Sequence, residues 1–67
     1  MVRTEIVTAE SIDPESVVLI KERRWRVVAN EDQVEGNPHL VEMTLTKGDG
    51  FQRTIKIDRL TPLEIVL

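Results

Sequence analysis

The chain has 67 residues, a formal net charge of −3 and no cysteine. A chain of this length forms one small domain, whose single core buries only about 60% of the surface that the unfolded chain exposes. The absence of cysteine excludes thiol nucleophiles, zinc sites with cysteine ligands and disulfide scaffolds.

Small domains of this size are commonly stabilised by disulfides, a structural metal or oligomerisation. The one histidine, His39, does not suffice for a closed metal site. Oligomerisation is therefore the remaining means by which the domain gains stability. The N-terminus has no apolar targeting core, and no segment approaches the roughly 18 consecutive apolar residues of a membrane span. We therefore expect one soluble, cytoplasmic domain over residues 1–67, in which residues 1–15 form an N-terminal strand and loop.

The segments "SVVLIK" and "WRVVA" predict a first β-hairpin, because both are rich in β-branched residues and only a few residues separate them. The loop consists of Glu22 and Arg23 alone, or it includes one more residue on each side. Either loop places Ile20 opposite Trp25 and turns one apolar face toward the core. This face consists of Val18, Ile20, Trp25, Val27 and Ala29, with Val18 opposite Val27.

The clearest element is a second hairpin in "HLVEMTLTKGDGFQRTIKID", which follows the polar loop "NEDQVEGNPH". A three-residue connection, Gly48-Asp49-Gly50, keeps the alternating apolar residues of both strands on one side, whereas a two-residue turn would expose one set to water. We expect a type I turn that ends in a left-handed Gly50. The facing pairs are then Leu45 with Arg53, Met43 with Ile55 and Val41 with Ile57.

The chain ends with "DRLTP", which predicts one tight turn of 3-10 type, and the short strand "LEIVL". This layout over residues 16–67 resembles that of small SH3-like barrels. The resemblance implies an all-β, small SH3-like barrel of five to six antiparallel strands with a short 3-10 turn before the last strand. An OB-type barrel is the alternative, although it normally has longer strands and a helix.

Charge is unevenly distributed along the sequence. The stretch "KERRWR" carries a basic patch around the only tryptophan, whereas residues 30–42 hold four carboxylates and no Lys or Arg. The hairpin register turns Trp25 inward, so its ring is not expected to stack on a base, while the cations remain free to contact phosphates or an acidic partner. The basic patch consists of Lys21, Arg23, Arg24 and Arg26.

No residue pattern points to catalysis, a cofactor or a metal. His39 follows a proline at the boundary of a loop and a strand, no serine stands in a nucleophile-elbow context, and the spacing of a calcium-binding loop is absent. With one Trp, one Phe and no Tyr, the chain is also a poor match for domains that bind proline-rich peptides or methylated lysines on several aromatic rings.

The predicted barrel leaves apolar residues on a second face, which needs a cover. The cover is either the N-terminal strand, through Ile6 and Val7, or another subunit. The sequence therefore predicts a protein-contact surface made of Val17, Leu19, Val28, Ile65 and Leu67.

These observations predict a non-enzymatic binding module that acts through protein contacts, self-associates as a homo-oligomer and needs no cofactor. In size and fold the chain is similar to small β-barrel accessory or inhibitor proteins of phages and prophages. One alternative is a nucleic-acid-binding domain that uses the basic hairpin at residues 21–26. Another is an oligomeric barrel that sequesters a nucleotide or another anionic small ligand.

Overall fold

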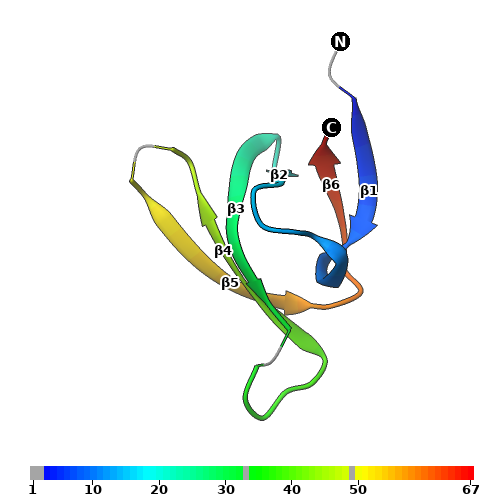
Figure 1. Cartoon of the computed structure of the whole chain (residues 1–67). Coiled ribbons are helices and arrows are strands. Elements are labelled where there is room, and N and C mark those ends of the chain that lie inside the picture. The colour runs from blue at the N-terminus through cyan, green and yellow to red at the C-terminus, as the bar shows by residue number, and fades with distance from the viewer. Residues whose placement is uncertain (1–2, 33, 49) are drawn as a thin grey trace.

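In the computed structural model, which describes residues 3–32, 34–48 and 50–67, the chain is all-β. The described residues form one six-stranded antiparallel sheet in the order β1-β6-β2-β3-β4-β5, which coils around its own core (Figure 1). The strands are β1 (Thr4–Thr8), β2 (Val17–Ile20), β3 (Arg23–Glu31), β4 (Leu40–Thr46), β5 (Gln52–Asp58) and β6 (Pro62–Val66). The prediction of an all-β domain is therefore confirmed.

The core lies on the inner face of the coiled sheet. Its largest fully buried side chain is Met43 on β4, and Trp25 on β3 is only 7% exposed. The placement of Trp25 in the core, predicted from strand alternation, is therefore confirmed. The buried apolar residues are Ala9, Ile12, Val18, Trp25, Val27, Val41, Met43 and Leu45, with Val7, Ile20, Ile55, Ile57, Leu63 and Ile65 packed against them.

The β4–β5 hairpin has the predicted register. Leu45 pairs with Arg53, Met43 with Ile55 and Val41 with Ile57, because only this register buries the apolar residues of both strands together. Gly50 has the predicted positive φ, 86°. Gly48 also has a positive φ, 91°, which a type I turn does not have at its first central residue, so the predicted turn type was wrong. Asp49, the middle residue of the predicted loop, lies outside the described residues.

The β2–β3 hairpin differs from the prediction by two residues. Val18, rather than Ile20, pairs with Trp25, and Ile20 pairs with Arg23. The loop is therefore Lys21-Glu22, and both residues have a positive φ, 52° and 65°, as in a type I′ turn. Because the shift is an even number of residues, the predicted apolar face survives as far as Val27.

A β-bulge after Val27 interrupts the alternation of core-facing residues along β3. The register between β3 and β4 shifts between Val27 and Ala29, so Ala29 leaves the core face, and its predicted place there was wrong. The next residue, Asn30, pairs with Met43 and thereby turns toward the core. Its Nδ2 donates hydrogen bonds to the carbonyl oxygens of Ala9 at 2.9 Å and Ile12 at 2.8 Å.

The N-terminal strand extends the sheet and does not cover its outer face. Strand β1 pairs with β6, so that Val7 lies opposite Leu63 and Ile6 opposite Glu64. Val7 packs against the core, whereas the Ile6 side chain is 71% exposed. The N-terminal strand, one of the two predicted covers, therefore does not lie over the second apolar face.

The 3-10 helix η1 (Ala9–Ser11) lies between β1 and β2, where a polar loop was predicted. The connection from β5 to β6 has the single i to i+3 hydrogen bond of a tight turn, from Thr61 N to Asp58 O at 3.0 Å. The predicted tight turn before the last strand is therefore present. Among the described residues, however, the segment that forms a 3-10 helix is η1 and not this turn. Backbone bonds from Ala9 N to Thr61 O and from Glu10 N to Arg59 O join the two segments.

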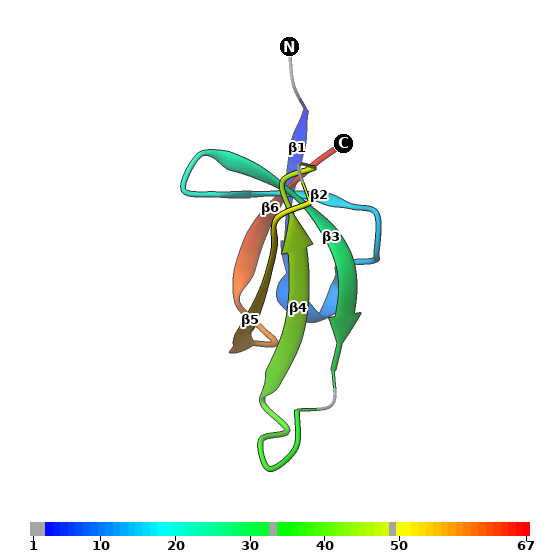
Figure 2. The same ribbon diagram turned by 90° about the vertical axis from the view of Figure 1, so that its left-hand side faces the viewer.

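The turns divide between two ends of the molecule. Since Arg26 pairs with Thr46, the β2–β3 turn and the β4–β5 turn lie toward the same end, and the loop after β3 lies at the other (Figure 2). Residues 21–26 of the first hairpin are thereby brought close to residues 47, 48 and 51–53 of the second, which are far from them in the sequence.

Candidate functional site

A cationic surface occupies the end that carries the β2–β3 and β4–β5 turns, and we call it the basic end. The four predicted basic residues lie there, all exposed. Two further cations from the second hairpin join them: Lys47 directly follows β4, and Arg53 pairs with Leu45. The basic end therefore consists of Lys21, Arg23, Arg24, Arg26, Lys47 and Arg53.

The centre of the basic end is the Trp25 ring. Lys47 Nζ lies 4.7 Å from the centroid of this ring and 5.8 Å from that of Phe51, and the two rings are 6.3 Å apart in a tilted arrangement. These distances are within the range of cation–π attraction. The cation covers part of the tryptophan that the neighbouring strands leave accessible.

Two hollows flank Trp25, one on each face of the sheet. The outer hollow has a volume of about 270 Å³ and is lined by Val17, Arg24, Arg26, Thr46, Lys47, Gly48 and Val66. The inner pocket, on the core face, has a volume of about 160 Å³ and is lined by Ile20, Lys21, Trp25, Leu45, Arg53 and Ile55. Because its lining comes from four consecutive strands, β2 to β5, the inner pocket depends on the coiling of the sheet.

An apolar strip crosses the outer face. Val17 pairs with Val66 and Leu19 with Glu64 across β2 and β6, and Ile6 pairs with Glu64 across β1. We call Ile6, Val17, Leu19 and Val66 the outer patch. Its members point away from the core because their neighbours Val7, Val18 and Ile65 are packed into it.

The predicted protein-contact residues are only partly gathered in this place. Val17 and Leu19 are half-buried members of the outer patch, and Val28, 39% exposed, lies at the bulge of the neighbouring strand. Ile65 is separated from them, because it packs against the core opposite Val18. Leu67 is 68% exposed at the end of the ladder, where its N–H bonds to Arg3 O.

Two charged side chains lie on either side of Leu19 in one row across the sheet. Arg24 pairs with Leu19 on one side, and Glu64 pairs with Leu19 on the other. Neighbouring strands are about 4.8 Å apart, so a cation and a carboxylate lie on opposite sides of one leucine. Glu64 also accepts a hydrogen bond from the Thr4 hydroxyl.

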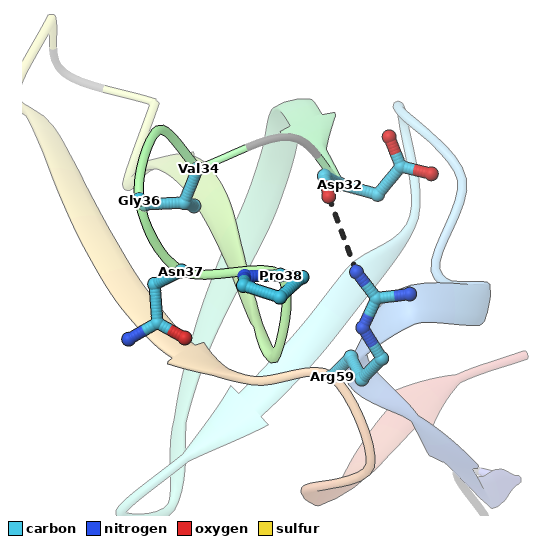
Figure 3. A pocket seen from close by; sticks show the side chains of 6 residues that line it. All are labelled: Asp32, Val34, Gly36, Asn37, Pro38 and Arg59. Atoms are coloured by element: carbon cyan, nitrogen blue, oxygen red, sulfur yellow. Dashed lines mark hydrogen bonds between the residues drawn. The ribbon is translucent and has the colours of Figure 1, made fainter.

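The opposite end is organised around Arg59, which closes a pocket of about 440 Å³ with Asp32, Val34, Gly36, Asn37 and Pro38 (Figure 3). Arg59 Nη2 donates to the carbonyl oxygen of Asp32 at 3.2 Å, and Nη1 lies 3.5 Å from the Glu10 carboxylate. The Arg59 backbone N–H also bonds to His39 O at 2.9 Å. These bonds hold the loop after β3, η1 and the β5–β6 turn together, which is a structural role.

The His, Asp and Glu side chains of the described residues do not gather into a metal-binding cluster. No group of three or more His, Asp or Glu side chains in these ranges could hold a metal ion. His39 is exposed, and its backbone N–H bonds to the Asn37 side chain. In the part of the chain that is described, no helix is both long and apolar enough to cross a membrane.

Comparison of the sequence with protein-family models gives no match, and a search of curated proteins gives no significant match. Sequence reasoning missed Lys47, Arg53, Glu64 and Val66 as members of charged or apolar surfaces. For Lys47 and Arg53 a signal existed, because the predicted hairpin register already placed both near the β4–β5 turn.

Proposed function

We propose that the chain is a non-enzymatic protein-binding module that self-associates through the outer patch. The observation that carries the proposal is the row formed by Arg24, Leu19 and Glu64 on β3, β2 and β6. A leucine with one charge of each sign on its two sides is self-complementary, which an isologous interface requires. In this proposal a second copy of the chain covers the second apolar face.

The symmetry of the row determines which residues meet. If two outer faces pack about a two-fold axis that runs along β2, Leu19 of one copy meets Leu19 of the other. The rotation exchanges the two sides of β2, so Arg24 of each copy meets Glu64 of the other. Each dimer then contains two ion pairs around an apolar centre, and the Glu64 carboxylate has acceptor positions for both Thr4 and the guanidinium.

The proposal is tested by the oligomeric state of charge-reversal variants in analytical ultracentrifugation. Arg24→Glu alone and Glu64→Arg alone should each weaken the dimer at least tenfold, because both place like charges together at two positions. An equimolar mixture of the two variants should form a heterodimer, since both of its ion pairs are present, one with the native polarity and one with the polarity reversed. Lys56→Glu, which makes the same charge change on the outer face of β5, is the matched control and should leave the dimer intact.

A third variant, Leu19→Asp, should give a folded monomer because it places a carboxylate at the centre of the apolar contact. Circular dichroism checks that the variant remains folded. A wild-type chain that sediments as a monomer at all accessible concentrations would sink the self-association proposal. So would a mixture of the two charge variants that stays monomeric while the wild type dimerises.

A further inference from the structure

We propose that the inner pocket is a docking site for a segment of a partner protein that presents one apolar side chain between carboxylates. The pocket lies on the core face of the sheet, opposite the outer patch, so this contact is separate from self-association. It rests on the proposed function only in the statement that the chain binds proteins.

The walls of the inner pocket provide the apolar half of this recognition. Ile20, Leu45 and Ile55 line it beside the Trp25 ring, and Ile20 and Ile55 remain half-buried. Its volume of about 160 Å³ is close to the roughly 150 Å³ of an apolar cavity that accepts a benzene molecule. One leucine-sized or phenylalanine-sized side chain therefore fits, and an aromatic wall is the usual setting for such an anchor at protein interfaces.

The rim of the pocket provides the charged half. Lys21 and Arg53 stand at its edge, and the described lining contains no carboxylate. Arg24 and Arg26 belong to the outer hollow on the other face, so Lys21 and Arg53 are the cations that line this pocket. Glu22 is the exposed acidic residue of the β2–β3 turn. An occupant with carboxylates next to its apolar side chain matches this field, whereas a basic or neutral segment does not.

The same geometry favours a peptide over a nucleic acid. A base needs an aromatic face on which to stack, but Trp25 is only 7% exposed and Lys47 Nζ lies over its ring. Trp25 therefore offers no open stacking surface to a base. A small pocket with apolar walls instead suits an aliphatic or aromatic side chain of a peptide.

The test uses two heptapeptides of Asp and Glu that carry either Leu or Ser at the central position. Trp25, the only tryptophan, reports binding by its fluorescence, and titration calorimetry gives the affinity. The Leu peptide should bind. The Ser peptide should bind at least about tenfold more weakly, because burial of the leucine side chain is lost. An emission shift toward shorter wavelength is expected for the Leu peptide, since the pocket becomes drier.

The matched variants are Arg53→Gln and Lys56→Gln, which remove one charge each from the same strand on opposite faces. Arg53→Gln should weaken the Leu peptide about three- to tenfold, and Lys56→Gln less than twofold. The Leu19→Asp variant should bind the Leu peptide as well as the wild type does. Failure of dimerisation therefore leaves this proposal intact, and failure of peptide binding leaves the dimer proposal intact.

Two outcomes would overturn the docking proposal. One is equal affinity for the Leu and Ser peptides, which would show that only charge is recognised at the basic end. The other is an oligothymidine of twelve nucleotides that binds more tightly than the Leu peptide, displaces it, and loses affinity steeply with salt. That result would assign the basic end to nucleic acid.

Discussion

Lys47 Nζ lies 4.7 Å from the centroid of the Trp25 ring, so a cation from the β4–β5 hairpin covers the core tryptophan of β3. The contact joins the two hairpins at the basic end. It also explains how a tryptophan in a cationic stretch is held in the core without offering its face to solvent.

Replacement of Lys47 by methionine should lower the free energy of unfolding by about 0.5–1 kcal/mol, because the apolar stem is kept and the cation–π attraction is lost. Urea denaturation measures the change, and easier quenching of Trp25 fluorescence by iodide should accompany it. Lys56→Met, on the outer face of β5 and exposed, is the control and should change stability by less than about 0.5 kcal/mol. Equal effects of the two substitutions would argue against a specific contact.

The β2–β3 turn should be improved by substitution. Lys21 and Glu22 both have a positive φ, which costs non-glycine residues about 1 kcal/mol each and which Asn-Gly adopts most readily. The double variant Lys21→Asn with Glu22→Gly should therefore raise the free energy of unfolding by about 1 kcal/mol. Thermal unfolding measures the gain, and Glu22→Ala, which retains the strain, should give none. A fall in stability of the double variant would contradict the turn geometry.

Asn30 should be among the polar residues most sensitive to substitution. Its side-chain amide donates to the carbonyl oxygens of Ala9 and Ile12. Its loss removes this donor from Ile12 O and leaves Ala9 O with only the long bond from Ile12 N–H, at 3.4 Å. Asn30→Ala should cost about 1–3 kcal/mol of unfolding free energy. Asn30→Asp should cost more, because it places a carboxylate against the same two carbonyl oxygens.

Both Asn30 variants are compared with Asn37→Ala in the exposed loop before β4, which should cost less than about 1 kcal/mol because its bond to His39 N–H lies at the surface. Chemical denaturation of the three variants gives the ranking. An Asn30→Asp variant as stable as the wild type would show that the two hydrogen bonds from the Asn30 amide do not stabilise the fold.

Arg59 should matter more through its bond to a backbone carbonyl than through its ion pair. The Arg59 and Glu10 side chains are 32% and 38% exposed, so their ion pair contributes less than about 1 kcal/mol. Glu10→Gln should therefore change stability by less than about 0.5 kcal/mol. Arg59→Ala should cost about 1–2 kcal/mol, because the bond to Asp32 O is lost as well. An equal cost for the two variants in urea denaturation would mean that the ion pair dominates.

The β4–β5 hairpin shows what alternation predicts well. Its apolar residues lie at every second position on both strands, and one loop length keeps them together, so the pairs Met43–Ile55 and Leu45–Arg53 followed from parity alone. The β2–β3 hairpin was misplaced by two residues because its turn uses lysine and glutamate at positions where Asn and Gly are the usual signal.

Other features depend on tertiary contacts that leave no periodic trace. Ala9 and Ile12 are buried, but they lie in and next to a three-residue helix, which is too short to show a pattern. The bulge after Val27 moved Ala29 off the core face and Asn30 onto it, and nothing in "VVANED" marks that shift. The resemblance to SH3-like barrels and to phage accessory proteins stays a prediction.

The candidate site was predictable only in part for a related reason. The grouping of the basic residues in 21–26 and the inward direction of Trp25 can be predicted from the pattern of a single hairpin. The addition of Lys47 and Arg53, and the place of Glu64 beside Leu19, require the order in which strands neighbour one another across the sheet. A single sequence does not determine that order from local patterns.

Strand β3 runs from Arg23 at the basic end to Glu31 at the other, where Glu31 pairs with Glu42. The chain is acidic as a whole, with a net charge of −3, yet it is an electric dipole whose positive pole surrounds Trp25. The field of an approaching acidic partner exerts a torque on this dipole as well as an attraction. The torque rotates the protein before contact, so that the end with the two hollows faces the partner. This protein should therefore be retained on a cation-exchange resin at low salt near neutral pH despite its negative net charge. The resin binds the positive pole, and its attraction for that pole is not set by the net charge of the whole molecule.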